Sequence, residues 1–469
     1  MSDLALLPIP FWASFLVLLG VSRFAWLNRE KGWGYPALAV IGTVIAWYHG
    51  DVLYNGYAQY ANSFPDPILD QAWWQIALFG VSFGAFVFIV PRLLNKKLQG
   101  SSSVVESLLN GSMSIAALQP ALKNVATGLC ILWFLIFLIS VWGASGDVLG
   151  VLAPYYWEPT SGLTRGQVAS SIFDSLYSVI ESLRVICAAL AGVCAVLLRP
   201  GMPRNMMFLL VVLTWPPFLL NRTRNVMLAI ALPAILSLVF LRWRRRLPLQ
   251  IGFLVFAFLA ANFWFKFVIA NRGQATIVAA VKDSTARADV DPDEIRHLGF
   301  NMFEELCWVD YLTENSMYKP VWGMLYFANF VNPIPRAIWP GKPTMGLDYA
   351  IARGQREMDD GGTTATISTG MIGSGITNFG PLIGPVAAAF LMSLWCAFLA
   401  RLDLQGRDFG YLLVYILGLV LTFNFGRDIT ILVAYPALFG WGVLWCWRKI
   451  SPYKPPRGVS KHPSRIPAS

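Results

Sequence analysis

The sequence contains little charge and few cysteine or histidine residues. Charged residues make up 13% of its 469 residues, whereas hydrophobic residues make up 56%. Soluble globular domains carry about 25% charged residues, so this composition excludes a water-soluble fold. The six cysteines lie mostly inside apolar runs, without the spacing of a disulfide framework or a zinc site. The three histidines are scattered. The sequence therefore predicts neither a metal nor another cofactor.

Apolar runs that can cross a roughly 30 Å hydrocarbon core are abundant, and they predict an all-α polytopic bundle of about 11 transmembrane helices. The first run lacks a basic segment before it and a cleavage site, so we interpret it as a retained span. A short or re-entrant element is expected around Val321–Phe330. The predicted spans lie near residues 5–22, 35–49, 73–92, 125–145, 171–198, 206–220, 225–241, 251–270, 380–400, 409–425 and 428–447.

These spans divide the chain into four parts. Residues 1–271 hold the first eight helices, and residues 272–379 form a large polar loop with the expected substrate site. Residues 380–447 hold the last three helices, and residues 448–469 form a basic tail.

The positive charge of the chain predicts its orientation. The formal net charge is +10, and Lys and Arg gather in one set of alternating loops, most densely at 242–246. The positive-inside rule places those loops and the tail in the cytoplasm, and the 272–379 loop outside. Nucleic-acid binding is a poor interpretation because the cations are divided among many short loops. Their expected partner is the lipid bilayer.

A proline-rich block, Asn332–Thr344, lies in the outer loop. Its four prolines fix their own φ angles and bias the residues before them to extended geometry. Arg336, Lys342 and Trp339 are thereby held beside the membrane, as a site for an anionic, sugar-bearing substrate requires.

Several cations at the outer ends of spans could bind a diphosphate. Arginine binds phosphate oxygens in a bidentate manner, and fixed cations near a low-dielectric bilayer stabilise the charge on a leaving diphosphate. The alternatives are contacts with lipid headgroups and, for Arg184, an ion pair with Glu181 on the same helical stripe. The candidates are Arg184, Arg222, Arg224, Arg336, Lys342 and Arg427, and Arg336 is also a candidate catalytic residue.

Transfer of a sugar to a hydroxyl also needs a general base. Glu304 and Asp310 are the preferred catalytic candidates because they lie on an amphipathic helix expected over Phe300–Leu312, although most charged residues on such a helix simply form its solvated face. The remaining acids and histidine considered are Glu305, His297, Asp348 and Asp428. Trp339 and Asn378 are candidate sugar-binding residues, and Trp308 and Tyr349 could also stack on sugars or anchor the membrane interface.

Three parts of the sequence resemble the bacterial polysaccharide repeat-unit polymerases of the Wzy type, which build O-antigen and enterobacterial common antigen. The first is Asn221-Arg-Thr-Arg-Asn at the start of a span. The second is Pro335-Arg-Ala-Ile-Trp-Pro-Gly-Lys-Pro, followed by Ile367-Ser-Thr-Gly-Met-Ile-Gly-Ser and Asn378-Phe-Gly. The third is Phe425-Gly-Arg-Asp-Ile between the last two spans.

The resemblance implies a C-type glycosyltransferase-like fold in the bacterial inner membrane, with the active site facing the periplasm. It implies metal-independent transfer of a growing glycan from undecaprenyl diphosphate to a new undecaprenyl-diphosphate-linked repeat unit. A chain-length regulator and a flippase of the same pathway are possible partners. One alternative is an O-antigen ligase, which transfers the polysaccharide to lipid A-core and would need an outer histidine such as His297. A polysaccharide flippase or transporter and a structural scaffold are alternatives from other classes.

Overall fold

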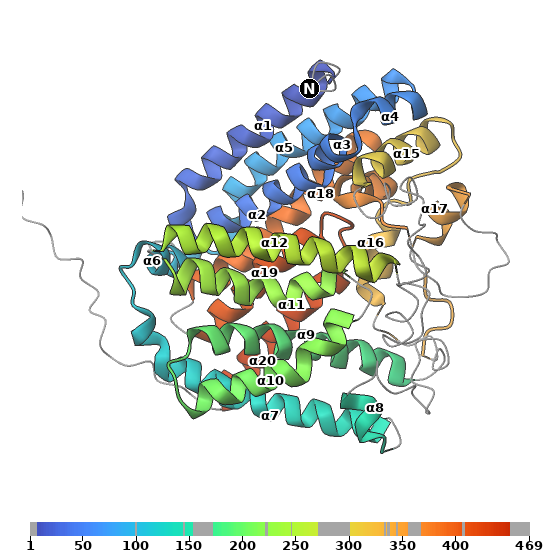
Figure 1. Cartoon of the computed structure of the whole chain (residues 1–469). Coiled ribbons are helices and arrows are strands. Elements are labelled where there is room, and N and C mark those ends of the chain that lie inside the picture. The colour runs from blue at the N-terminus through green and yellow to red at the C-terminus, as the bar shows by residue number, and fades with distance from the viewer. Residues whose placement is uncertain are drawn as a thin grey trace, which may run out of the picture.

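A computed structural model shows a bundle of helices (Figure 1). It describes residues 7–98, 101–143, 146–152, 172–220, 224–244, 246–270, 301–332, 334, 338–343, 346–354, 367–405 and 409–450, and these residues contain no strand. Six helical segments are long and apolar enough to cross a membrane: Ile9–Leu27, Gly34–Asn55, Asp66–Leu94, Ile115–Trp142, Ile180–Leu197 and Gly370–Leu404. The protein is therefore an all-α, multi-pass membrane protein, as its composition predicts.

A helix covers each apolar run that the sequence predicts as a span. The long helices are α1 (Ile9–Leu27), α2 (Gly34–Val44), α5 (Asp66–Leu94), α7 (Gln119–Gly143), α9 (Ile172–Leu197), α10 (Met202–Leu220), α11 (Arg224–Leu236), α12 (Leu247–Ala270), α18 (Gly370–Leu404), α19 (Phe409–Asn424) and α20 (Ile431–Ile450). Short helices lie between them: α3 (Gly50–Asn55), α4 (Tyr57–Ser63), α6 (Val104–Asn110), α8 (Val148–Leu152), α15 (Met302–Glu314), α16 (Met324–Val331) and α17 (Leu347–Ala352).

Glycines allow α1 and α5 to lie side by side (Figure 1). A Cβ on Gly80 would lie 2.8 Å from Val17 Cγ1, and one on Gly84 would lie 3.1 Å from Val21 Cγ2. Membrane helices lack a hydrophobic drive toward one another, so close backbone approach at small residues is a main source of their packing energy.

Helix α18 is broken near its start and consists of two packed halves. Gly380 has φ 82° and ψ 173°, which separates Gly370–Phe379 from the longer half that follows. A Cβ on Gly375 would lie 2.1 Å from the carbonyl oxygen of Gly384, so the two halves are in backbone contact. The helix thus begins at Gly370, before the boundary predicted at residue 380, and its first half is buried inside the protein.

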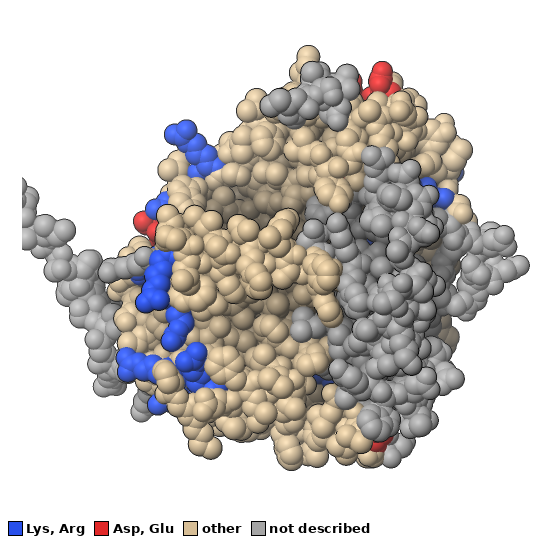
Figure 2. Space-filling view, viewed as in Figure 1, with Lys and Arg blue, Asp and Glu red and all other residues tan. Residues whose placement is uncertain are grey.

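Lysines and arginines gather along one edge of the bundle, near α6 (Figure 2). Hydrogen bonds and ion pairs hold several of them there. Arg29 Nε lies 3.2 Å from Glu106 Oε1, and Arg244 donates to the Leu108 carbonyl at 3.0 Å. We call this the cation-rich edge. Helices α15, α16 and α17 lie at the opposite edge, which we call the outer edge (Figure 1).

Candidate functional site

Three segments that are distant in the sequence meet at the outer edge: the start of α18, the 425–430 loop between α19 and α20, and α16. The loop accepts hydrogen bonds from the first amides of α18, Gly370 N to Arg427 O at 2.8 Å and Met371 N to Gly426 O at 3.0 Å. Thr430 Oγ1 donates to Asn329 Oδ1 on α16 at 3.1 Å. The unpaired amides of a helix N-terminus need partners, and here the loop supplies them.

The 425–430 loop packs closely against Ile45–His49, an aromatic π-helical turn that continues α2. A Cβ on Gly426 would lie 1.9 Å from Trp47 Cδ1, so no side chain fits at this position. The Trp47 indole donates to the Phe423 carbonyl at 3.0 Å, and Tyr48 Oη accepts from Ile372 N at 2.9 Å. Trp47 and Tyr48 therefore fix both the loop and the start of α18.

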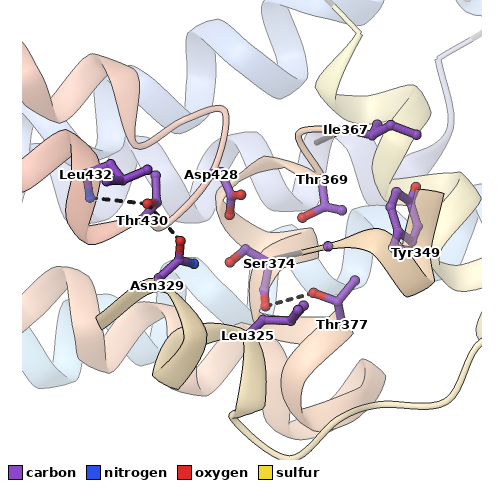
Figure 3. Close-up of a pocket in the computed structure, with 11 residues that line it drawn as sticks. Leu325, Asn329, Tyr349, Ile367, Thr369, Ser374, Thr377, Asp428, Thr430 and Leu432 are labelled. Carbon is purple, nitrogen blue, oxygen red and sulfur yellow. Dashed lines mark hydrogen bonds between the residues drawn. The ribbon is translucent and has the colours of Figure 1, made fainter. Parts of the chain in front are cut away.

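A polar cavity of about 90 Å³ lies between these segments and α17. Figure 3 shows hydroxyl groups and one carboxylate around it, with the Asp428 side chain pointing toward Ser374. The cavity is lined by Leu325, Asn329, Gly346, Tyr349, Ile367, Thr369, Ser374, Thr377, Asp428, Thr430 and Leu432. Asp428 and Tyr349 were among the candidates from the sequence, whereas Asn329, Thr369, Ser374 and Thr430 were not. Thr369 and Ser374 lie in a Gly- and Thr-rich stretch that includes the start of α18, and this composition was the available signal for these two.

The environment of Asp428 suits a group that exchanges a proton. Burial raises the pKa of the Asp428 carboxyl to about 6, although the Ser374 hydroxyl, the Ile429 amide and the charge of Arg427 all favour the carboxylate. At neutral pH the group is therefore mostly ionised and can still accept a proton.

Asn378 joins the first half of α18 to α16. Its amide nitrogen donates to the Ser374 carbonyl at 2.8 Å, and its Oδ1 accepts from Leu325 N in the first turn of α16 at 3.1 Å. The side chain has no exposed surface. In this structure Asn378 caps a helix, and the predicted contact with a sugar has no accessible atom to make it.

Helix α17 covers one side of the cavity and is held on α15 by a cluster of polar contacts. Tyr349 donates to Glu305 Oε2 at 2.8 Å, and Arg353 Nη2 lies 3.7 Å from Glu305 and 3.9 Å from Glu304. The Arg353 guanidinium also lies 3.9 Å from the centre of the Trp308 ring. Burial raises the pKa of Glu305 against the opposing effect of Arg353. Glu304, predicted as a catalytic base, therefore belongs to this cluster.

Asp310, the other preferred base, lies in the interface between α15 and α5. It is 0% exposed and accepts from Gln75 Nε2 at 2.8 Å. Burial raises its pKa to about 7, against the effect of the Gln75 and Gln71 amides. A carboxylate without exposed surface cannot contact a substrate in this structure. Asp51 has a related role, because its Oδ2 accepts from Phe303 N at 2.8 Å and caps α15.

The predicted cations and Trp339 occupy separate places. Lys342 Nζ donates to the carbonyls of Asn332 and Ile334 at 2.8 and 2.9 Å, which closes the proline-rich turn. The Trp339 ring contacts Phe327 of α16 edge-on, with centroids 6.3 Å apart.

Arg184 pairs with Glu181 at 3.5 Å and donates to Ser140 at 2.6 Å, between α9 and α7. Arg427 directly precedes Asp428, which lines the cavity. The remaining predictions lie outside the described residues: Arg222, Arg336, His297 and the side chain of Arg224.

Comparisons with models of protein families, with curated proteins and with solved structures find no match to this chain. The described residues also contain no group of three or more His, Cys, Asp or Glu placed to hold a metal ion.

Proposed function

We propose that the protein is a polysaccharide polymerase, a glycosyltransferase that joins lipid-linked repeat units at the outer face of the bacterial inner membrane. The donor is a glycan on undecaprenyl diphosphate, and the acceptor is a sugar hydroxyl of a new lipid-linked repeat unit. One observation carries the proposal. Two of the segments that resemble the Wzy-type polymerases, Ile367–Ser374 and Phe425–Ile429, line the same polar cavity, the first with Ile367, Thr369 and Ser374 and the second with the Asp428 carboxylate.

The cavity suits the acceptor hydroxyl. Its volume of about 90 Å³ is several times the space that one ordered water needs, so it takes the reacting edge of a sugar. The hydroxyls of Thr369, Ser374 and Thr430 can orient that edge by hydrogen bonds. Asp428 then accepts the proton of the acceptor hydroxyl, as a general base with a pKa of about 6 can do near neutral pH.

The transfer balances without a metal. The acceptor oxygen forms a bond to the anomeric carbon of the donor, while the bond from that carbon to the diphosphate oxygen breaks. The bonding electrons leave with the diphosphate, and the acceptor proton goes to Asp428. Arg427 lies beside this site, and we assign to it, together with Arg222 and Arg336, the stabilisation of the leaving diphosphate.

Replacement of Asp428 by Asn tests the proposal. Asp428→Asn keeps the size of the side chain and removes the base, so polymerisation should fall by about 10²–10⁴-fold. A deletion strain that carries the variant should accumulate single repeat units on undecaprenyl lipid. Asp348→Asn is the matched control, because Asp348 is an exposed carboxylate on α17. Normal polymer from Asp428→Asn at normal membrane levels would refute the assignment.

The same strain separates polymerase from ligase. A ligase defect would leave long polymer on undecaprenyl lipid, because the polymer forms but is not passed to lipid A-core. A polymerase defect would instead leave single repeat units on undecaprenyl lipid.

A further inference from the structure

A second cavity adjoins the polar one and extends from it along the helices. Its volume is about 330 Å³, and Asn329 and Thr430 line both cavities. The remaining wall comes from α16, from the middle of α18, from the 425–430 loop and from the first turns of α20. We call this second cavity the apolar groove.

The polarity of the apolar groove changes along its length. Asn329 and Thr430 supply an amide and a hydroxyl at the end shared with the polar cavity. Beyond them the wall is apolar and rich in aromatic rings: Phe330, Leu391, Trp395, Phe398, Phe425, Ala434 and Leu438 are part of it. From its first residue, Ile431, to Leu438, α20 rises by about 10 Å. The groove therefore passes from the polar outer edge into the depth of the apolar helices.

We propose that the apolar groove binds the isoprenoid chain of the lipid-linked substrate, with the diphosphate at the junction formed by Asn329 and Thr430. This inference rests on the proposed function. The two cavities share Asn329 and Thr430, so a substrate whose sugar lies beside Asp428 can extend its lipid end past Thr430 into the apolar groove. An apolar cavity of about 150 Å³ already binds benzene, so the groove has room for several branched isoprene units.

Chain-length dependence of binding tests the proposal. The purified full chain in detergent is titrated with geranyl, farnesyl and geranylgeranyl diphosphate, without an acceptor. These probes share one headgroup, so differences among them report on the chain alone. Affinity should increase by about ten-fold or more for each added isoprene unit while the groove is filling, since two buried methylene groups already account for that factor.

Substitutions on α20 locate the binding site. Ala434→Phe fills the groove and should remove most of the preference for geranylgeranyl over geranyl diphosphate. Val443→Phe is the matched control, because Val443 is exposed on the same helix and does not line the groove. If Ala434→Phe does not fold, Leu438→Ala serves instead, because it enlarges the groove and should extend the chain length at which affinity stops rising.

Three outcomes would overturn the inference. The wild type could bind the three probes with the same affinity, or the groove variants could keep the same preference for geranylgeranyl over geranyl diphosphate as Val443→Phe. Phosphatidylglycerol could also displace all three probes equally well. The last outcome would assign the groove to a bilayer lipid. Because binding is measured without transfer, these outcomes are distinct from a failure of Asp428→Asn to affect polymerisation.

Discussion

Asp428 determines how the proposed reaction depends on pH. Burial raises its pKa to about 6, so the carboxyl is protonated below that pH and cannot accept the acceptor proton. The turnover rate with saturating substrate should therefore be constant near neutral pH and fall about ten-fold per unit below about pH 6. Asp348→Asn should keep this profile. A rate that does not change between about pH 5 and 8 would remove Asp428 from the proton transfer.

Gly426 allows the 425–430 loop to pack directly against Trp47 because it has no side chain. Gly426→Ala would place a methyl group 1.9 Å from Trp47 Cδ1 and force the 425–430 loop away from the Ile45–His49 turn. Overpacking of this kind costs about 1–3 kcal/mol, so the thermal unfolding temperature in detergent should fall and polymerisation should be lost. Gly442→Ala is the control, because a Cβ there meets no atom within 4 Å. Equal unfolding temperatures for the two variants would contradict the close packing.

The sequence shows acidic residues near the ends of spans, but it does not show which of them adjoin the cavity. An amphipathic pattern indicates that α15 has a polar face, but it does not show which carboxylates other helices will cover. Asp310 is covered by α5, and Glu304 is paired with Arg353. Asp428, one of several acids near span ends in the sequence, adjoins the cavity because the start of α18 and α16 fold against its loop.

At the scale of elements, helices were predictable where apolar residues form long runs. The first half of α18 was not, because its glycines, serine and threonine resemble those of a polar loop. In the folded chain these small residues allow close packing, and Gly370–Ile376 is buried throughout. These residues are buried by segments that are distant in the sequence, and local composition gives no information about those segments.

The contact between the two halves of α18 can be tested with two glycines of the same half-helix. A Cβ on Gly375 would lie 2.1 Å from the Gly384 carbonyl oxygen, whereas one on Gly373 meets its nearest atom at 3.4 Å. Gly375→Ala should therefore separate the halves, lower the unfolding temperature and reduce polymer length on gels. Gly373→Ala should resemble the wild type. Similar behaviour of the two variants would show that the halves do not need this contact.

At the scale of the whole molecule, the cation-rich edge predicts the orientation in the membrane. A cysteine in place of Gly341, exposed in the proline-rich turn, should react with a membrane-impermeant thiol reagent in intact spheroplasts. A cysteine in place of the exposed Ser112, beside α6, should react only after the membrane is ruptured. Both belong in a Cys446→Ser background, because Cys446 is exposed. The reverse labelling pattern would invert the orientation and remove the proposed site from the outer face.

The order in which the cavity walls occur along the chain has a consequence for biogenesis. The 425–430 loop supplies the proposed base and accepts hydrogen bonds from the first amides of α18. Among the residues that line the cavity, only Leu432 comes after this loop in the sequence. During synthesis, a nascent chain that ends before this loop has the earlier spans inserted and no complete cavity. The cavity is therefore completed late, when the last hairpin of helices enters the membrane.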